Sequence, residues 1–475
     1  MNLGALTGSG ETASVTGFAI DHRKVAPGTV FGAFRGERFN GEDFIAQAVA
    51  SGAVAVVSRP QAKPAGAVHI PADEPRREFA RLAAKFFRPM PGTVVAVTGT
   101  NGKTSSVELA RQLWRMAGHP SASIGTLGVT TADEQVTTGL TTPDIVTFLT
   151  NMAGLRRMGI DHAAFEASSH GLSQYRTEGL PVQAAAFTNF SRDHLDYHGT
   201  MEAYFLAKMR LFEEVVEADG AAVIWADDAK SDEVIARCER RGLRVLTVGV
   251  AGEALKLVKR ETTAMGQRLT VRADGADYVV QLGLIGAYQA ANALTAAGLV
   301  IATGGAVAPT LANLSRVHPV RGRLERAVIS RAGTPIYVDY AHTPDAIVSA
   351  CEALRPHVKG RLIIVLGAGG DRDTGKRGPM GEAAARYADM VIVTDDNPRG
   401  EDPVAIRHSI LQGAHGATEV AGRREAIRAA IAQAGEDDIV LLAGKGHEQG
   451  QIVGAGKDLR VLPFDDVQVA REEAG

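Results

Sequence analysis

The sequence has few cysteines, because only Cys238 and Cys351 occur among its 475 residues. They lie far apart in the sequence and offer neither a disulfide framework nor a cysteine cluster that could hold zinc. An uninterrupted apolar run of about 18 residues, long enough to cross a bilayer, is also missing. Residues 1–16 lack the basic and then apolar pattern of a signal peptide. We therefore expect a cytoplasmic protein without membrane insertion.

Charge of one sign is not in excess either. The 51 Lys and Arg residues and the 54 Asp and Glu residues give a net charge of −3. Charge therefore gives no reason to expect binding to nucleic acid or to a membrane surface. Hydrophobic residues make up 45% of the chain and charged residues 22%, which is ordinary for a soluble globular protein. The chain is too long for one hydrophobic core, so we expect about three domains.

A glycine-rich loop follows the short apolar run Val94–Val97. The loop, Thr-Gly-Thr-Asn-Gly-Lys-Thr at 98–104, leads into a predicted helix at 105–117. Backbone N–H groups of such a loop bind phosphate, the lysine reaches the outer phosphates, and the threonine hydroxyl binds Mg²⁺. The common pattern has four residues between its glycines, whereas only two separate Gly99 from Gly102. This short form favours an ATP-dependent amide ligase.

Two breaks divide the chain. The prolines of Arg88–Gly92 indicate a linker, and a second boundary lies near His318–Arg323, so we predict domains at 1–90, 91–318 and 319–475. Buried strands that alternate with helices predict an α/β fold, with functional residues at the carboxyl ends of parallel strands. The expected strands include 30–34, 53–57, 94–97, 163–165, 184–188, 221–224, 336–338, 362–366, 390–393 and 439–442, and the expected helices include 44–50, 105–117 and 201–216.

Titratable residues follow two strands of the second domain. Glu166 ends one strand beside the phosphate loop, so its carboxylate is a candidate Mg²⁺ ligand, although it could equally be a helix-capping acid. His194 follows the next strand and is a second candidate ligand, whereas His198 is more simply a surface or capping residue. Lys208 lies among apolar neighbours on the predicted helix 201–216. The residues alone favour a lysine whose stem covers apolar surface.

Charged loops follow the predicted strands of the third domain, at 339–345, 367–373, 395–399 and 444–448. The glycines of the second loop do not complete a dinucleotide fingerprint, because Arg372 stands in place of the third glycine. Acids, an amide and a guanidinium together suit a zwitterionic ligand, with arginine on its carboxylate and acids on its ammonium group. By itself, Asn397–Pro398 would be an ordinary turn.

Taken together, these motifs resemble those of the Mur ligases over nearly the full length of the chain. The resemblance rests on the loop 98–104, Glu-Ala-Ser-Ser-His-Gly-Leu at 166–172, Thr-Asn-Phe-Ser-Arg-Asp-His-Leu-Asp-Tyr-His-Gly at 188–199, Gly-Arg-Leu-Glu at 322–325, Asp-Tyr-Ala-His-Thr-Pro-Asp at 339–345 and Gly-Lys-Gly-His-Glu at 444–448. It implies a UDP-binding N-terminal domain, a central P-loop ATPase-like domain with a parallel sheet, and a Rossmann-like C-terminal domain that brings the incoming amino acid.

The activity that the resemblance implies belongs to peptidoglycan precursor synthesis. ATP would phosphorylate the D-glutamate carboxylate of UDP-N-acetylmuramoyl-L-alanyl-D-glutamate, and the amino group of the incoming amino acid would then displace phosphate from the acyl phosphate. We expect such an enzyme to act as a monomer.

The resemblance also implies roles for individual residues. The ATP site would comprise Gly99, Thr100, Asn101, Gly102, Lys103, Thr104, Asn292, Arg323 and Asp339. The UDP-muramyl dipeptide would be held by Ile20, His22, Thr141, Thr142, Ser168, Gln174 and Arg176. The catalytic residues would be Lys103, Glu166, His194 and Lys208, and the metal ligands Thr104, Glu166, His194 and Lys208. Lys208 matches the family's N-carboxylated lysine, whose CO₂-derived carbamate offers Mg²⁺ two hard oxygens where an ammonium group would repel it. This implication replaces the apolar-surface interpretation of Lys208.

The motif Asp396-Asn397-Pro398-Arg399 bears on the choice of amino acid. Within the family it is the form found where meso-2,6-diaminopimelate is added, and a bidentate arginine suits the extra distal carboxylate of that substrate. Arg377, Gly444 and Glu448 match the rest of that pocket. One departure is His22, which stands where the family usually has serine, although imidazole can still donate or accept a hydrogen bond.

Three other functions stay open at this point. The first is the L-lysine-adding form of the same ligase, which Arg399 disfavours. The second is folylpolyglutamate synthetase, which has a related ATP loop but lacks a UDP-binding N-terminal domain such as residues 1–90 resemble. The third is a non-catalytic protein that uses ATP as a switch, for which the charged C-terminal loops would be unnecessary.

Overall fold

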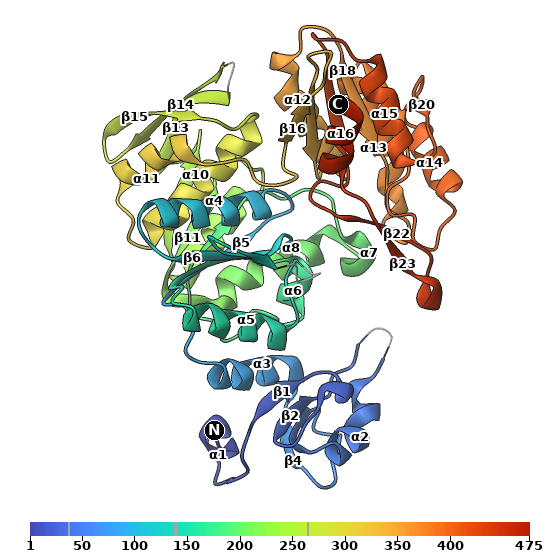
Figure 1. Ribbon diagram of the computed structural model, residues 1–475. Helices are drawn as coiled ribbons and strands as arrows, with labels where there is room; N and C mark the ends of the chain where they lie inside the picture. The colour runs from blue at the N-terminus through green and yellow to red at the C-terminus, as the bar shows by residue number, and fades with distance from the viewer. Residues whose placement is uncertain (37–38, 137–140, 264–265) are drawn as a thin grey trace.

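The computed structural model describes residues 1–36, 39–136, 141–263 and 266–475. Three sheets follow one another along the chain, and each is mainly parallel and packed with helices (Figure 1). This arrangement confirms the predicted α/β class with three domains. The limits 1–90, 91–318 and 319–475 stay a proposal for where one domain ends and the next begins.

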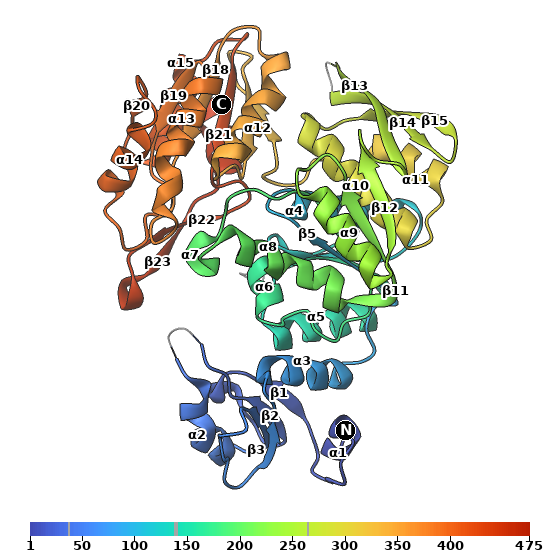
Figure 2. The same cartoon turned by 180° about the vertical axis from the view of Figure 1, so that it is seen from behind.

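The N-terminal sheet has four parallel strands in the order β1-β2-β3-β4. Its elements are β1 (Gly17–Ala19), β2 (Thr29–Gly32), β3 (Ala53–Ser58), β4 (Val68–Pro71), α1 (Leu3–Thr7), α2 (Ile45–Ala50) and α3 (Pro75–Phe86). Helix α3 buries Phe79 and Leu82, and the ring of Phe79 lies 5.3 Å from that of Phe18 in β1. In Figures 1 and 2, α3 lies between this sheet and α5 of the central domain.

The central sheet has eleven strands in the order β15-β14-β13-β12-β11-β10-β5-β9-β6-β7-β8. The strands are β5 (Thr93–Thr98), β6 (Ser121–Gly125), β7 (Gly128–Thr130), β8 (Gln135–Val136), β9 (His162–Glu166), β10 (Val182–Phe187), β11 (Val216–Trp225), β12 (Arg244–Gly249), β13 (Leu255–Thr263), β14 (Gly266–Ala273) and β15 (Ala276–Leu282). The helices are α4 (Lys103–Met116), α5 (Ile145–Arg157), α6 (Ser169–Ser173), α7 (Leu195–His198), α8 (Met201–Arg210), α9 (Ser231–Arg241), α10 (Ala287–Ala302) and α11 (Val307–Asn313).

The middle of this sheet is parallel and buried on both faces. Strand β5 pairs with β10 on one side and β9 on the other, and Val94–Val97 is fully buried. A continuous apolar run of this kind is typical of a parallel strand covered by helices. The carboxyl ends of these strands therefore place the phosphate loop, Glu166 and the segment after β10 at one edge.

The C-terminal sheet has six strands in the order β16-β17-β21-β18-β19-β20. The strands are β16 (Glu325–Ile329), β17 (Pro335–Asp339), β18 (Leu362–Leu366), β19 (Met390–Val393), β20 (Thr418–Glu419) and β21 (Ile439–Ala443), and β22 (Gly450–Val453) and β23 (Arg460–Pro463) form a separate antiparallel hairpin. The helices are α12 (Pro344–Leu354), α13 (Arg377–Tyr387), α14 (Pro403–Leu411), α15 (Arg423–Gln433) and α16 (Asp466–Ala474). Figure 1 shows the hairpin extending away from the sheet.

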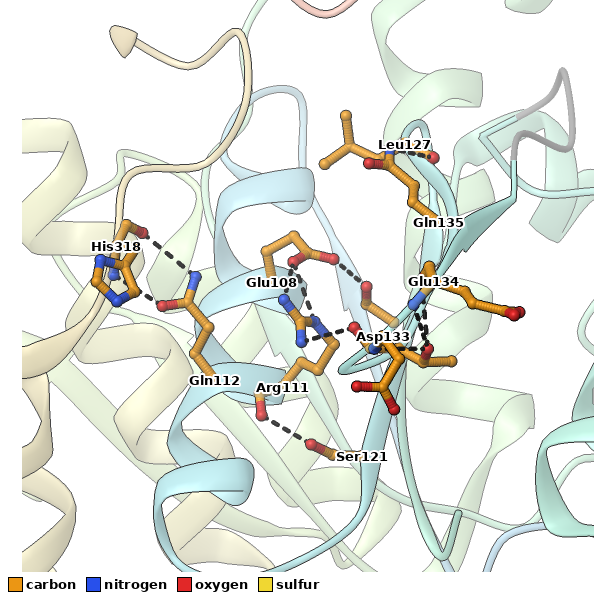
Figure 3. Close-up of polar contacts among 11 residues, drawn as sticks. Glu108, Arg111, Gln112, Ser121, Leu127, Asp133, Glu134, Gln135 and His318 are labelled. Atoms are coloured by element: carbon orange, nitrogen blue, oxygen red, sulfur yellow. Dashed lines mark hydrogen bonds and ion pairs between the residues drawn. The ribbon is translucent and has the colours of Figure 1, made fainter. Parts of the chain in front are cut away.

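Helix α4, which follows the phosphate loop, makes polar contacts with β6 and the segment after β7 on one side and with the backbone at His318 on the other (Figure 3). Glu108 and Arg111 form a buried ion pair at 2.9 Å, Ser123 of β6 donates to Glu108, and Arg111 donates to the carbonyl oxygen of Thr131 after β7. The side chain of Gln112 accepts from the backbone N–H of His318 at 2.8 Å and donates to its carbonyl oxygen at 3.2 Å. The segment that leads to the C-terminal domain is thus attached to α4.

Cys238 in α9 and Cys351 in α12 are both free and buried. Burial raises the pKa of each thiol to about 12. Within the described ranges, no helix is both long and apolar enough to cross a membrane.

Candidate active site

The phosphate loop connects β5 to α4, and the helix begins at Lys103. Gly99 has a φ of 147° and Gly102 a φ of 83°. A Cβ on Gly99 would lie 1.9 Å from the Thr188 hydroxyl, and one on Gly102 would lie 2.3 Å from Oδ1 of Asn292. Both glycines are therefore required sterically. Lys103 Nζ donates to the carbonyl oxygens of Gly99 and Thr100, at 3.0 and 2.7 Å, so its amine lies across the loop where phosphates would bind.

Glu166, His194 and Lys208 face the same loop. Glu166 is buried at the end of β9, where its carboxylate accepts from the backbone N–H and the hydroxyl of Thr126 at 2.7 and 3.1 Å. His194 adopts a left-handed φ of 54°, and burial together with Lys103 lowers the pKa of its imidazole well below the ordinary value. A neutral imidazole is the form that binds metal.

Lys208 on α8 is 1% exposed. Its Nζ donates to the carbonyl oxygen of Gly99 at 2.7 Å and lies 4.3 Å from the ring centre of Tyr204. Burial, reinforced by the positive charge of Lys103, lowers the pKa of the Lys208 amine well below its usual value. The buried amine is therefore favoured in its neutral, nucleophilic form.

The donors around the loop fit Mg²⁺ bound together with phosphate. Thr104 and Glu166 offer hard oxygens, and Mg²⁺ usually takes only one or two carboxylates from a protein and completes its shell with phosphate oxygens and waters. In the described part of the chain, no three His, Cys, Asp or Glu side chains are grouped closely enough to hold a metal. The oxygens of a bound nucleotide and of waters would complete such a shell.

Arg323 and Asp339 come from the C-terminal domain and meet the phosphate loop. Arg323 Nη2 donates to the Thr104 hydroxyl at 2.9 Å. Asp339, at the end of β17, accepts from the backbone N–H groups of Leu324 and Ala341 at 2.6 and 2.8 Å. Burial raises the pKa of the Asp339 carboxyl to about 6, against the opposing effect of Arg323.

A polar network beside Glu166 contains four of the residues expected at the muramyl dipeptide. The Thr142 hydroxyl donates to the Glu166 carbonyl oxygen at 2.8 Å and lies 2.9 Å from the Ser168 hydroxyl. Arg176 donates to the Thr142 carbonyl oxygen at 2.7 Å and to Oε1 of Gln174 at the same distance. These hydrogen bonds hold the four side chains in fixed positions relative to one another and to Glu166.

One cavity of about 940 Å³ joins these groups. From the predicted set, its lining includes Thr100, Asn101, Gly102, Lys103, Thr104, Thr141, Thr142, Glu166, Ser168, Arg176, His194, Lys208, Asn292, Arg323, Asp339, Asp396, Asn397, Arg399, Gly444 and Glu448. Residues of the central and C-terminal domains thus share one space. Gly99, Gln174 and Pro398 lie next to lining residues in sequence or by contact but are not part of its wall.

Three predicted residues lie elsewhere. Ile20 and His22 are in the N-terminal domain, where the His22 ring stacks on Phe44 with 4.4 Å between ring centres and 2° between ring planes. Arg377 is buried at the start of α13, and its guanidinium pairs with Glu401 at 2.9 Å instead of lining the cavity. Sequence reasoning assigned no role to His342, Lys376 or Arg372, which do line it.

The turn at 396–399 is held in an unusual backbone conformation. Asn397 and Arg399 have left-handed φ values of 47° and 51°. Arg399 Nη1 donates to the carbonyl oxygens of Gly370 and Asn397 at 3.0 and 3.3 Å, and none of the ion pairs between described residues includes this guanidinium. Its charge is therefore available at the cavity wall.

Three family models match successive parts of the chain. They are the Mur ligase family, catalytic domain, over residues 14–87, the Mur ligase middle domain over 97–300, and the Mur ligase, glutamate ligase domain, over 322–446. The UDP-N-acetylmuramoyl-L-alanyl-D-glutamate--2,6-diaminopimelate ligase of Zymomonas mobilis is 59% identical over 96% of this chain and 94% of its own length. The chain belongs to the Mur ligase family. The ligase of the same name from Bradyrhizobium diazoefficiens is 51% identical to this Mur ligase over 95% of the chain and 93% of its own.

Solved structures agree with this membership. A structure titled as a UDP-N-acetylmuramoyl-L-alanyl-D-glutamate--2,6-diaminopimelate ligase is 31% identical to this Mur ligase, with a TM-score of 0.72 over 100% of this chain and 98% of that one. The folylpolyglutamate synthase of Mycobacterium tuberculosis has a TM-score of 0.64 at 21% identity, covering 76% of this chain and 89% of its own. The second likeness concerns the fold alone.

Proposed function

We propose that this Mur ligase joins meso-2,6-diaminopimelate to the D-glutamate of UDP-N-acetylmuramoyl-L-alanyl-D-glutamate, using ATP, in peptidoglycan precursor synthesis. The observation that carries the proposal is the single cavity that connects the phosphate loop, at Lys103, with the turn that presents Arg399. A ligase needs its phosphoryl donor and its amine in one space, because the activated carboxylate must meet the amine before water reaches it. We further propose that the protein acts in the cytoplasm as a monomer, and its two free, buried cysteines suit a reducing compartment.

The first step would transfer the γ-phosphoryl group of ATP to the D-glutamate carboxylate. A carboxylate oxygen forms the new bond to phosphorus, the bond between the γ-phosphorus and the bridging oxygen breaks, and ADP leaves. Lys103 stabilises the charge on the transferring group, while Asn292, Arg323 and Asp339 hold the nucleotide. Mg²⁺, held by Thr104, Glu166, His194 and a carbamate on Lys208, would neutralise the phosphate oxygens.

In the second step the amino group attacks the acyl carbon. The bond from carbon to the phosphate oxygen breaks, inorganic phosphate leaves, and the nitrogen loses a proton as the amide forms. The substrate is held on the N-terminal side by Ile20, His22, Thr141, Thr142, Ser168, Gln174 and Arg176. The His22 ring stacks on Phe44. It would therefore contact UDP through the edge of the ring, at the position where the family usually has a serine hydroxyl.

The carbamate would form by attack of the Lys208 amine on CO₂, with release of one proton. Two features of Lys208 support this proposal. The side chain is buried at the phosphate loop, and burial and Lys103 lower the pKa of the amine, which favours the neutral form that attacks CO₂. Carboxylation would also replace the nitrogen of the amine, as the group facing the metal, with two hard, negatively charged oxygens.

The choice of amino acid would depend on Arg399. Its side chain is half-buried at the cavity wall, and the neighbouring Arg372 adds positive charge and lowers the pKa of Arg399 further than burial alone. The distal carboxylate of diaminopimelate would satisfy this guanidinium, whereas L-lysine would leave it without an anionic partner. Asp396, Asn397, Gly444 and Glu448 would hold the ammonium and carboxylate groups of the same substrate, and Arg377 would support the pocket from behind.

The test compares two amino acids and two variants. Purified protein is supplied with ATP, the UDP-muramyl dipeptide and either diaminopimelate or L-lysine, and phosphate release is measured. Wild type is expected to prefer diaminopimelate by about 10⁴-fold in kcat/KM. Arg399→Ala should lose mainly diaminopimelate use while the KM for ATP stays near wild type, and Arg386→Ala, which removes an exposed arginine of α13, should change neither. Equal use of the two amino acids by wild type would contradict the proposed specificity.

A further inference from the structure

Lys445 is a completely buried lysine immediately after β21, with 0% of its side chain exposed. Its Nζ lies 2.7 Å from the carbonyl oxygen of Gly450, 3.1 Å from Oδ1 of Asp396, 3.3 Å from Oδ1 of Asn397 and 3.5 Å from Oε2 of Glu448. Burial of a charged lysine is costly unless every donor is paired. The contacts to Gly450 and Asn397 are hydrogen bonds, and those to Asp396 and Glu448 are ion pairs. Three of these four partners are side chains that we propose bind the incoming amino acid.

The cavity wall includes Asp396, Asn397, Gly444 and Glu448 but not Lys445. The lysine therefore lies behind the wall and reaches the ligand space only through its partners. Lys445 would therefore not contact the substrate directly. It can affect ligation only by changing the orientation and the charge of the side chains in the cavity wall.

Lys445 fixes the direction of the Asn397 amide. Oδ1 of Asn397 accepts from Lys445 and also from the backbone N–H of Ile452 at 2.9 Å. With both donors on the oxygen, the amide nitrogen must point the other way, and Nδ2 donates to Oε2 of Glu448 at 2.7 Å. Reversal of the amide would place its N–H groups against those two donors.

Lys445 also allows two carboxylates to be close together. Burial and the neighbouring Asp396 both raise the pKa of Glu448, while Lys445 opposes them. Against the effect of its own burial, Asp396 has a lowered pKa because of Lys445 and, second, Arg423. Without the lysine, the buried Asp396 and the partly buried Glu448 would lose a positive charge that favours their ionised forms. Both carboxylates line the cavity in which an ammonium group would bind.

The same amine contacts three segments of the chain. Asp396 and Asn397 belong to the turn after β19, Glu448 to the loop after β21, and Gly450 to the first strand of the hairpin. The hairpin is attached to the turn a second time, where the backbone N–H of Arg399 donates to the carbonyl oxygen of Ile452 at 3.0 Å. A shift of Lys445 would therefore move several sides of the pocket together.

We propose that Lys445 is the positioning residue of the amino-acid pocket, and that it sets the geometry and charge of Asp396, Asn397 and Glu448 for a zwitterionic amino acid. The proposal rests on the proposed ligase function, but it does not depend on which amino acid is used. It predicts an effect confined to the amino-acid substrate, whereas a purely structural role would reduce the amount of active protein and leave each KM unchanged.

The experiment measures three KM values in Lys445→Met, for ATP, for the UDP-muramyl dipeptide and for the amino acid that wild type ligates. The KM for the amino acid is expected to rise by about 30-fold or more, because a buried ion-pair partner is lost, while the other two stay within about twofold. Lys445→Arg keeps the positive charge but changes its shape. Its KM for the amino acid should lie between those of wild type and Lys445→Met. Arg361→Met removes an ion pair with Asp438 at the opposite end of β21 and should leave all three values unchanged.

The possible outcomes separate the two proposals. An amino-acid KM within about twofold of wild type in folded Lys445→Met overturns the role of Lys445, as does an equal rise for all three substrates. If Lys445→Met melts below the assay temperature, Lys445→Arg is decisive by the same criteria. A wild type that rejects diaminopimelate but ligates another amino acid refutes the proposed specificity, and the Lys445 measurement is then made with that other amino acid.

Discussion

At Lys208 the fold places an amine where a metal-bound phosphate is expected. The side chain is fully buried, and the Gly99 carbonyl oxygen lies within hydrogen-bond distance of Nζ. A neutral, unmodified amine at this position would offer Mg²⁺ only a nitrogen, whereas the proposed carbamate would supply two hard oxygens. The proposed metal site therefore depends on the chemical state of this one side chain.

Lys208→Ala is expected to lower ligation by about 10³-fold, because metal-ligand oxygens next to the transferring phosphoryl group are lost. Wild type grown or incubated with ¹³C-bicarbonate should show a carbamate resonance that Lys208→Ala lacks. Lys230→Ala removes a half-exposed lysine paired with Glu233 and serves as the matched control, with wild-type activity and an unchanged spectrum. Full activity in Lys208→Ala would refute the assignment.

Asp339 predicts a pH dependence in ATP use. Its pKa of about 6 is above the ordinary value, so the carboxylate that would accept from ribose hydroxyls is present above that pH and is lost as the pH falls through 6. The KM for ATP is expected to be constant above about pH 7 and to rise about tenfold by pH 5. In Asp339→Asn the KM should be raised at every pH and nearly flat over this range. A wild-type KM that does not change between pH 7 and pH 5 would contradict the prediction.

Single residues were predictable where a short motif defines their chemistry. The glycines and Lys103 of the phosphate loop, Glu166 at a strand end and Arg399 after a turn all carry such a signal. Arg377 was assigned to the pocket by the family pattern, but it pairs with Glu401 and does not line the cavity. Lys445 and Lys376 carry no such signal, because nothing in a sequence shows that a lysine lies in a cavity wall or behind one. Their environment is created by loops that meet only in the folded chain.

At the scale of elements, each strand expected from a buried apolar run overlaps with an observed strand. The antiparallel strands β13 to β15 were not predicted. In β14 the buried Gln267, Leu269, Val271 and Ala273 alternate with more exposed polar residues, and in β13 only Leu255 and Leu257 are buried, so no continuous apolar run marks these strands. The helix predicted to reach residue 216 ends at Arg210 and continues as a π-helical turn over Leu211–Val215, and β11 begins at Val216.

The last helix, α16, is held against α15 by a buried ion pair, and we expect its loss to lower the stability of the domain. Arg423 and Asp466 are 1% and 0% exposed and lie 2.6 Å apart, and Arg423 also donates to the Ala443 carbonyl oxygen at the end of β21. Asp466→Ala should destabilise the C-terminal domain by about 3–5 kcal/mol, because it leaves a buried guanidinium without its partner. Urea unfolding followed by circular dichroism measures this change.

The control for that measurement is Arg355→Ala. Arg355 forms a surface ion pair with Asp389, in which the two side chains are 43% and 41% exposed. Its loss should cost less than about 1 kcal/mol. Similar unfolding midpoints for Asp466→Ala and wild type would show that the buried pair does not stabilise the domain.

At the scale of the whole molecule, catalysis depends on two domains that meet at one cavity. Arg323 of the C-terminal domain bonds to Thr104 of the phosphate loop, and the segment between them is attached to α4 through Gln112 and His318 (Figure 3). The sequence analysis proposed a boundary near residue 318, but the sequence did not indicate this attachment, since a glutamine in a helix has no distinctive pattern.

Gln112→Ala is expected to loosen the connecting segment without unfolding either domain. Two hydrogen bonds are lost, each worth about 1 kcal/mol or less at an exposed site, so trypsin should cut after Arg316, Arg321 or Arg323 about tenfold faster. The melting temperature should change little. Gln433→Ala removes a glutamine whose side chain bonds only to its own helix among the described residues, while its backbone contact to Arg361 is kept, and should leave the cleavage rate unchanged. Cleavage of Gln112→Ala at the wild-type rate would refute the prediction.

The two thiols give the experimenter a practical advantage. Because Cys238 and Cys351 are buried and their pKa values lie near 12, almost no thiolate is present at neutral pH to react with a maleimide. A dye pair could therefore be attached to cysteines introduced on the surfaces of α2 and α14 without removing the natural ones. Fluorescence transfer between the dyes would then measure the distance between the outer domains with and without each substrate.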